Sequence, residues 1–322
     1  MSLIDATSPA RGAVTSHQRL LALRFAARQL DTRRQKRALA QLAGSQRSTF
    51  RGRGIEFEEV RGYQPGDDIR AIDWRVTART GEAHTKMFHE ERERPVLIVV
   101  DQRAPMRFGS QHCFKAVLAA ELAALLAWSA LDKSERVGGL LIGDREHWEL
   151  RPRSSRKNVL SLLAALAKAA GETDGIRESS AMSADFPSLE QSFLDATRSL
   201  RRVARPGSSV FLISDFAGAS ADHVWAEIFQ LARHVQITAI HCSDPLEQQL
   251  PPAGEYCVTD GRGRAELNTN NAALRSSYAD AYADRVANLK HELQRLGVPM
   301  LEASTGLAPL TLLRDYFSAS GL

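Results

Sequence analysis

The sequence contains few cysteines and no long hydrophobic run. Its three cysteines, Cys113, Cys242 and Cys257, have no paired spacing and no neighbouring histidines at zinc-site intervals. Cys113 and Cys242 lie in apolar surroundings, so we expect buried free thiols and a reducing, cytoplasmic location. Lys115 and Glu121 interrupt the most apolar stretch, residues 114–131. We therefore expect no direct membrane insertion.

Familiar catalytic motifs are also missing. The sequence has neither a Gly-x-x-x-x-Gly-Lys-Ser/Thr phosphate loop nor a Gly-x-Ser-x-Gly nucleophile elbow. Its histidines are scattered, and no two have the helix spacing of a metal site. His241, in an apolar run, is interpreted as a core residue. These absences predict a protein that is not an enzyme.

Positive charge is concentrated near the N-terminus, although the net charge is only +4. Residues 1–16 are small and polar without periodicity, and we expect them to be disordered. Residues 17–49 are predicted to form a basic N-terminal helix, on which Arg33, Arg34, Lys36 and Arg37 make a basic face. The main interpretation is a solvated face, and the alternatives are a docking surface for an acidic partner or for nucleic acid.

The remaining chain divides at a change of pattern near Pro95. Residues 50–94 indicate strands around turns, and we expect a small β-rich arm. Residues 95–322 alternate strands with helices, which predicts a doubly wound, mostly parallel α/β domain. The expected strands are 96–101, 137–142, 148–150, 209–215, 236–242 and 298–302. The expected helices are 111–131, 155–170, 187–203, 221–233, 272–296 and 309–317, with a hairpin at 255–268.

Two of these strands end in carboxylates, Asp101 and Asp215. In open α/β sheets, ligands bind beyond the carboxyl ends of the strands, at the point where the strand order reverses. Asp101 and Asp215 are therefore expected to lie together at that edge.

The segment from Arg61 to Arg79 is dense in turn residues, charges and aromatics. Pro65, Gly66 and Asp67 give a strong turn signal. Its carboxylates and guanidinium groups belong to Asp67, Asp68, Asp73, Arg61, Arg70, Arg75 and Arg79. So many arginines favour a lattice of ion pairs that holds the arm, rather than a metal site or an acid pair. Trp74 is expected to be buried against the α/β domain.

This segment resembles the signature of the DUF58 family. The matching residues are Arg61, Tyr63, Pro65, Gly66, Asp67, Asp68, Arg70, Ile72, Asp73, Trp74, Ala78, Arg79 and Glu91. A second block, from Asp244 to Pro251 with Gly254 and Asp260 after it, is similar to a later motif of the family. The resemblance spans residues 50–318 and implies a von Willebrand factor A-like fold.

Such domains often carry a metal-ion-dependent adhesion site that begins Asp-x-Ser-x-Ser and binds Mg²⁺ through oxygen ligands. Here Asp101 is retained, but Arg103 and Pro105 stand where the serines should be. We therefore expect a degenerate site without metal, at which only Asp101 and Asp215 remain as ligands. Arg103 either pairs with Asp101 and Asp215 in place of the cation, and even offers its charge to a partner's acid, or it points to solvent while Asp101 caps the following turn.

The resemblance also implies a partner, a MoxR-type AAA+ ATPase. The chain would then be a partner or adaptor in the assembly or maturation of protein complexes, with unidentified protein cargo. The arm residues from Arg61 to Arg79, with Glu91, are the expected docking element. Two alternatives stay open: a hydrolase that uses the Asp101/Asp215 cleft, and a nucleic-acid-binding module that uses the basic N-terminal helix.

Overall fold

The computed structural model describes seven stretches of the chain, residues 6–30, 55–64, 72–90, 95–171, 188–219, 221–259 and 264–319. The chain forms two compact units, one made of Met1–Leu42 with Arg94–Leu322 and the other of Ala43–Glu93. Within the described stretches, no helix has the length and apolar character needed to cross a membrane.

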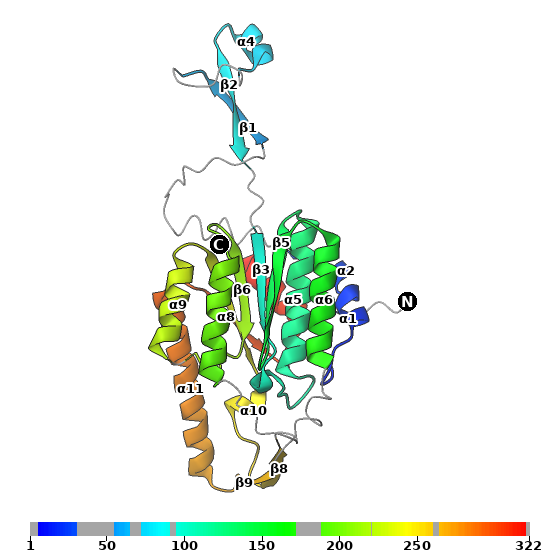
Figure 1. Cartoon of the computed structure of the whole chain (residues 1–322), viewed down its shortest axis with the longest axis vertical. Helices are drawn as coiled ribbons and strands as arrows, with labels where there is room; N and C mark the ends of the chain where they lie inside the picture. Colours follow the sequence, from blue (N-terminus) through cyan, green and yellow to red (C-terminus); the bar gives the residue numbers. More distant parts are fainter. Residues whose placement is uncertain are drawn as a thin grey trace. The chain divides into compact units, whose positions relative to one another are not determined.

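The larger unit is built on a six-stranded sheet (Figure 1). Its strands, in spatial order, are β10 (Met300–Ser304), β7 (Gln236–Ser243), β6 (Ser209–Ser214), β3 (Pro95–Asp101), β4 (Arg136–Ile142) and β5 (His147–Arg153). All neighbours are parallel except β5, which runs antiparallel to β4 as an edge strand. The predicted mostly parallel, doubly wound sheet is confirmed, and the strand order reverses between β3 and β6.

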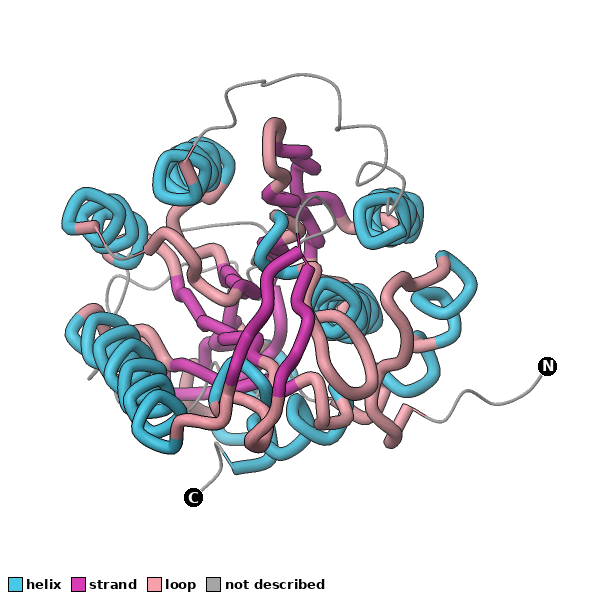
Figure 2. Tube along the Cα trace, turned by 90° about the horizontal axis from the view of Figure 1, so that it is seen from below, coloured by secondary structure: helices cyan, strands magenta, loops and turns pink. Residues whose placement is uncertain are grey.

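Helices cover both faces of this sheet (Figures 1 and 2). On one face lie α1 (His17–Ala22), α2 (Arg24–Ala27), α5 (Lys115–Asp132), α6 (Arg156–Gly171) and α12 (Pro309–Ala319). On the other face lie α8 (Leu189–Val203), α9 (Asp222–Ala232) and α11 (Ala272–Arg295). Strand β3 is buried from both sides, since Ile98 faces the first core and Val99 the second.

Small elements line the carboxyl edge of the sheet or extend beyond it. They are the 3₁₀ turn η2 (Ala104–Met106), the short helix α10 (Pro245–Gln248) and the predicted hairpin of β8 (Glu255–Thr259) and β9 (Arg264–Asn268). Three elements depart most from their predicted bounds. Helix α5 begins at Lys115 instead of Gln111, β10 spans Met300–Ser304 instead of 298–302, and β5 spans His147–Arg153 instead of 148–150.

The N-terminal segment differs from the prediction of disorder at residues 1–16. Residues 6–16 are placed by backbone contacts: Gly12 N donates to His112 O at 2.8 Å, and Phe114 N donates to Gly12 O at 3.2 Å. Ala10 is fully buried. These contacts join residues far apart in the chain, so the local sequence carried no periodic signal for them. Residues 1–5 lie outside the described part.

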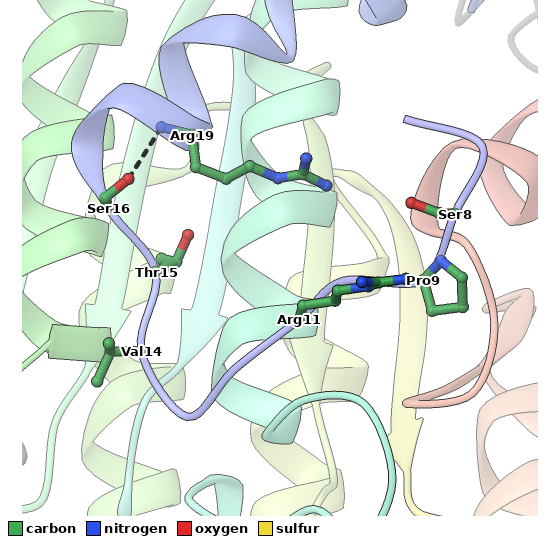
Figure 3. A pocket seen from close by; sticks show the side chains of 7 residues that line it. All are labelled: Ser8, Pro9, Arg11, Val14, Thr15, Ser16 and Arg19. Carbon is green, nitrogen blue, oxygen red and sulfur yellow. Dashed lines mark hydrogen bonds between the residues drawn. The ribbon is translucent and has the colours of Figure 1, made fainter. Parts of the chain in front are cut away.

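The predicted helix over 17–49 is instead two short helices, α1 and α2, where the chain is described. Ser16 caps α1 by accepting a hydrogen bond from Arg19 N (Figure 3), and Leu23 separates the two helices. The basic residues from Arg33 to Arg37 lie outside the described residues. Trp128 Nε1 donates to Leu20 O at 3.1 Å, and Ser129 Oγ donates to Leu30 O at 3.2 Å. These bonds fix the segment on α5.

One ion pair reinforces this attachment. Glu121 sits in α5 and is 2% exposed, and it accepts both Arg19 Nε at 2.8 Å and Arg19 Nη2 at 3.1 Å. A bidentate ion pair of this kind fixes both the position and the orientation of the Arg19 side chain. The Glu121 charge inside an otherwise apolar helix is therefore compensated by a residue of the N-terminal segment.

The smaller unit is a hairpin with a helix in its connection. Strand β1 (Ile55–Gly62) pairs antiparallel with β2 (His84–Glu90), with an irregularity between Phe57 and Glu59. The chain between them forms α4 (Trp74–Thr80), which was not predicted. Asp73 caps its first turn, and Gly81 ends it with a φ of 78° that favours glycine.

We predict that Arg19→Ala lowers the free energy of unfolding by about 3–5 kcal/mol, because it leaves the Glu121 charge buried without its partner. Urea unfolding measures this loss. Arg28→Ala is the matched control: Arg28 is 60% exposed and 3.7 Å from Asp132, so we expect a loss of less than about 1 kcal/mol. Equal losses in the two variants would contradict the account.

Candidate functional site

The site begins where β3 and β6 end side by side. Asp101 closes β3 and is fully buried. Its Oδ2 accepts a hydrogen bond from Ser214 Oγ at 2.7 Å, and Ser214 is the last residue of β6. Ser214 Oγ in turn accepts from Phe216 N at 2.8 Å. The parallel pairing of the two strands therefore brings the predicted carboxylate to the switch point of the sheet.

Arg103 lies directly against Asp101. Its Nε donates to Asp101 Oδ1 at 2.9 Å and its Nη2 to Asp101 Oδ2 at 2.7 Å. Two further guanidinium hydrogens reach backbone carbonyls, from Nη1 to Leu189 O at 2.7 Å and from Nη2 to Ala217 O at 2.9 Å. The guanidinium also stacks near Phe193, 5.2 Å from the ring centre. Arg103 thus connects the end of β3 to the start of α8 and to the turn after β6.

The guanidinium of Arg103 is fully buried. Burial by itself lowers the pKa of this group, but the hydrogen bond and charge of Asp101 outweigh burial and raise the pKa. The interpretation that Arg103 points to solvent is therefore wrong. So is the idea that it offers its charge to a partner's acid, because no part of the side chain is accessible.

Asp215 pairs with Lys115, not with Arg103 as one interpretation predicted. Lys115, the first residue of α5, places Nζ 2.8 Å from Asp215 Oδ2 and 2.6 Å from Glu247 Oε1. Lys115 is 1% exposed and Asp215 8%. Burial lowers the pKa of Lys115, yet the charges of Asp215 and Glu247 outweigh burial and raise it. Arg103 thus pairs with Asp101, and Lys115 lies between Asp215 and Glu247.

Sequence reasoning missed Glu247 and gave Lys115 no role in the site. A signal was available, because a lysine at the start of an almost wholly apolar helix needs a partner when that helix is buried. The partners are 100 and 132 positions away in the chain. Only the fold reveals which carboxylates they are.

A second buried carboxylate, Asp244, organises the loops beside this cluster. Its oxygens accept Ser110 N at 2.8 Å, Thr305 Oγ1 at 2.6 Å, Leu246 N at 3.0 Å and the Ser110 hydroxyl. Asp244 and Glu247 form a reciprocal capping box on α10. Burial raises the pKa of Asp244, but these hydrogen bonds outweigh it and lower the pKa.

Pro105 has a conformational role. It lies within the 3₁₀ turn η2 that follows Arg103. Asp144 holds this turn by accepting Ala104 N at 2.7 Å and by pairing with Arg107. The loop that would present serine hydroxyls in an adhesion site is therefore held by the Asp144 carboxylate.

Comparison with known proteins identifies the family. The family model described as "Protein of unknown function DUF58" matches residues 59–288. The chain belongs to the DUF58 family. Uncharacterised proteins of Mycobacterium bovis and Mycobacterium tuberculosis are each 30% identical to it over 267 residues, covering 82% of this chain and 79% of theirs.

Two solved structures are distantly similar. One is BatB from Bacteroides thetaiotaomicron, with 12% identity, a TM-score of 0.37 and coverage of 70% of this chain and 98% of that one. The other is an aerotolerance-related membrane protein from Bacteroides fragilis, with 11% identity, a TM-score of 0.39 and coverage of 70% and 99%.

The DUF58 signature falls in the smaller unit, and part of it is described. Tyr63 N donates to Ala83 O at 2.8 Å, which ties the end of β1 to the start of β2. Asp73 acts as a helix cap, accepting Arg75 N at 3.0 Å and Val76 N at 3.2 Å. Arg79 is exposed in the last turn of α4. The predicted residues Pro65, Gly66, Asp67, Asp68, Arg70 and Glu91, and the side chain of Arg61, lie outside the described residues.

The smaller unit by itself leaves the Trp74 side chain 67% exposed, and the expected packing of Trp74 against the α/β domain stays a prediction. Trp74 is the first residue of α4, and the half-buried face of that helix carries Val76 and Thr77 instead. Thr77 Oγ1 accepts His84 N at 3.0 Å, which fixes this face on β2. The Asp73 cap therefore sets the helix in a rotation that directs Trp74 outward.

The side chains at the DUF58 switch point do not fit Mg²⁺. Asp101 gives both oxygens to Arg103 and Ser214, and Asp215 gives its oxygens to Lys115 and Ala217 N. A hard divalent cation needs about six oxygen ligands, and its charge would be placed beside two fixed cations. Among the described residues, no group of three or more His, Cys, Asp or Glu side chains is positioned to hold a metal ion.

His241, on β7, belongs to the core beside this cluster. It is 6% exposed, and its ring lies 6.3 Å from that of Phe216. Burial lowers the pKa of His241 to about 4. The ring is therefore neutral near pH 7, as a core histidine is expected to be.

We predict that Arg103→Met lowers the free energy of unfolding by about 3–5 kcal/mol, because Asp101 keeps a buried charge without its partner. The double variant Asp101→Leu/Arg103→Met removes both charges, so its loss should be smaller than that of Arg103→Met alone. Chemical denaturation of both proteins tests this. A double variant less stable than the single one would show that the ion pair is not what the site depends on.

Proposed function

We propose that this protein is a non-enzymatic interaction module that docks on a MoxR-type AAA+ ATPase and acts in the assembly or maturation of protein complexes. The partner class is carried over from the family resemblance. The physical support is one surface of the smaller unit, the exposed face of α4.

That face combines an exposed tryptophan with exposed arginines. Trp74, Arg75, Ala78 and Arg79 are all exposed, and their spacing places them along one side of the short helix. Tryptophan and arginine are the residues most enriched among the side chains that dominate binding energy at protein interfaces. An exposed tryptophan flanked by arginines therefore has the composition of such a binding surface.

The face is also held in place before any partner arrives. Asp73 caps the start of α4, Gly81 N donates to Thr77 O at 2.9 Å at its end, and His84 N bonds to Thr77. Side chains on a rigid element lose little conformational freedom on binding, which favours affinity. The two guanidinium groups indicate an acidic complement on the partner.

The switch point of the larger unit supports a binding role over a hydrolytic one. Catalytic carboxylates need access to substrate and a pKa suited to proton transfer. Asp101 is fully buried and bound to Arg103, and Asp215 is bound to Lys115. Carboxylates that are buried and paired with cations in this way suit a structural role better than a catalytic one.

We predict that Trp74→Ala weakens binding to a MoxR-type ATPase of the same organism at least tenfold. This corresponds to a loss of about 1.4 kcal/mol or more of binding free energy, which is typical for a tryptophan at an interface. Biolayer interferometry with the purified ATPase measures it. Arg75→Glu should weaken binding as well, and more strongly at low salt.

Phe229→Ala is the matched control, since Phe229 is a 47% exposed aromatic on α9 and should leave binding unchanged. Melting temperatures of all variants should match that of the native protein, because α4 presents these side chains outward. Native affinity in a folded Trp74→Ala protein would refute the docking face. No binding by the native protein would refute the partner.

A further inference from the structure

The larger unit carries a group of cations where its edge strand passes into the next helix. Arg151 and Arg153 lie at the end of β5, and Arg156 and Lys157 are the first two residues of α6, which follows it (Figure 1). All four side chains are exposed, and we call them the basic edge. The docking face proposed above belongs to the smaller unit and makes no use of them.

Contacts with β4 hold the two parts of the basic edge together. Asn158 Nδ2, in the first turn of α6, donates to Val137 O at 2.6 Å and to Arg151 O at 3.0 Å. Arg153 is the partner of Val137 in the antiparallel pairing of β5 with β4, and Val137 belongs to the core that α6 covers. Directly paired residues point to the same face of a sheet, so Arg153 lies on the face that carries the start of α6.

The basic edge has no counter-ions of its own. None of its four side chains forms an ion pair within the described part of the chain. Glu149, the acid of β5, pairs with Arg202 of α8 at 3.8 Å instead. On α8, Arg198 and Arg201 both pair with Glu227. The charges of the basic edge are therefore available to an external anion, in contrast to those of α8.

The start of α6 adds to the positive potential of this surface. Backbone N–H groups give a helix N-terminus a partial positive charge, which acidic residues in the first turn commonly balance. The first turn of α6 has no acidic residue, and the helix begins with Arg156 and Lys157 instead. Cations at this position are repelled by the helix end, and a bound anion relieves that repulsion. The arrangement is unfavourable for the isolated helix and favourable for binding an anion.

The composition of the basic edge favours a nucleic acid over a membrane or a protein as the anion. The exposed large hydrophobic side chains of the described residues include none in 151–157, and the nearest in the chain is Trp148, at the other end of β5. Membrane-bound helices and the cores of protein interfaces depend on apolar side chains. Three of the four cations are arginines, whose planar fork matches the oxygens of a phosphate.

We infer that the basic edge binds the phosphate backbone of duplex DNA without sequence preference. A duplex carries one negative charge per about 1.7 Å of its axis, so several cations on a fixed surface can contact phosphates at once. Contacts to phosphates position a protein on DNA and read no bases. Such binding releases counterions, and four phosphate contacts give a slope of about −3 to −4 in a plot of log affinity against log salt concentration.

Fluorescence anisotropy of a labelled DNA duplex of arbitrary sequence, titrated with the full chain at several NaCl concentrations, tests the inference. We expect saturable binding with the salt dependence given above. The double variant Arg156→Ala/Lys157→Ala should weaken binding at least tenfold and make the slope shallower by about two, because two phosphate contacts are lost. Its melting temperature should not fall, since the two cations oppose the charge of the helix end.

Arg198→Ala/Arg201→Ala is the matched control. It also removes two positive charges, from side chains that are each 52% exposed, but both of these are paired with Glu227. It should leave DNA binding nearly unchanged. No binding of DNA by the native chain, native affinity in Arg156→Ala/Lys157→Ala, or equal losses in the two double variants would overturn the inference. Equally strong binding to phosphatidylserine vesicles would overturn the assignment to nucleic acid.

Discussion

The buried pair of Asp101 and Arg103 is the contact on which the larger unit depends. It joins the end of β3 to carbonyls at the start of α8 and after β6, so three segments meet at one guanidinium. Neither side chain has any exposed surface. The buried charges of Asp101 and Arg103 are tolerated because each has a close, hydrogen-bonded partner in the other. Lys115 is the cation partner of both Asp215 and Glu247, so each carboxylate of this cluster has a cation beside it.

The switch point, where α/β sheets commonly bind ligands, is occupied in the larger unit by the side chains of Arg103 and Lys115. Outward-facing chemistry lies elsewhere in the described residues. Trp74 and its arginines are presented by a capped helix of the smaller unit, and the basic edge is presented by β5 and the start of α6 in the larger one. Our proposals for the ATPase and for DNA rest on these two surfaces.

The sequence predicted what depends on local pattern and missed what depends on distant partners. Strand β3 was placed within one residue, because a continuous apolar run ending in Asp101 is typical of a buried parallel strand. The start of α5 was missed by four residues, because the loop before Lys115 is held by Gly12 and Asp244. The absence of serine ligands for a metal ion at positions 103 and 105 is visible directly in the sequence. The partner of Asp215 could not, since Lys115 is 100 residues away. The outward direction of Trp74 on α4 could not be predicted either, since it follows from the rotation of a helix that the Asp73 cap sets.

Anomalous diffraction from crystals grown in millimolar MnCl₂ can show whether a cation displaces Arg103, because manganese occupies magnesium sites and its anomalous signal locates it directly. We expect no anomalous peak between Asp101 and Asp215, with Arg103 still bound to both oxygens of Asp101. A hexacoordinate manganese ion bonded to Asp101, with the Arg103 side chain displaced from it, would show that the Asp101–Arg103 pair does not replace the metal.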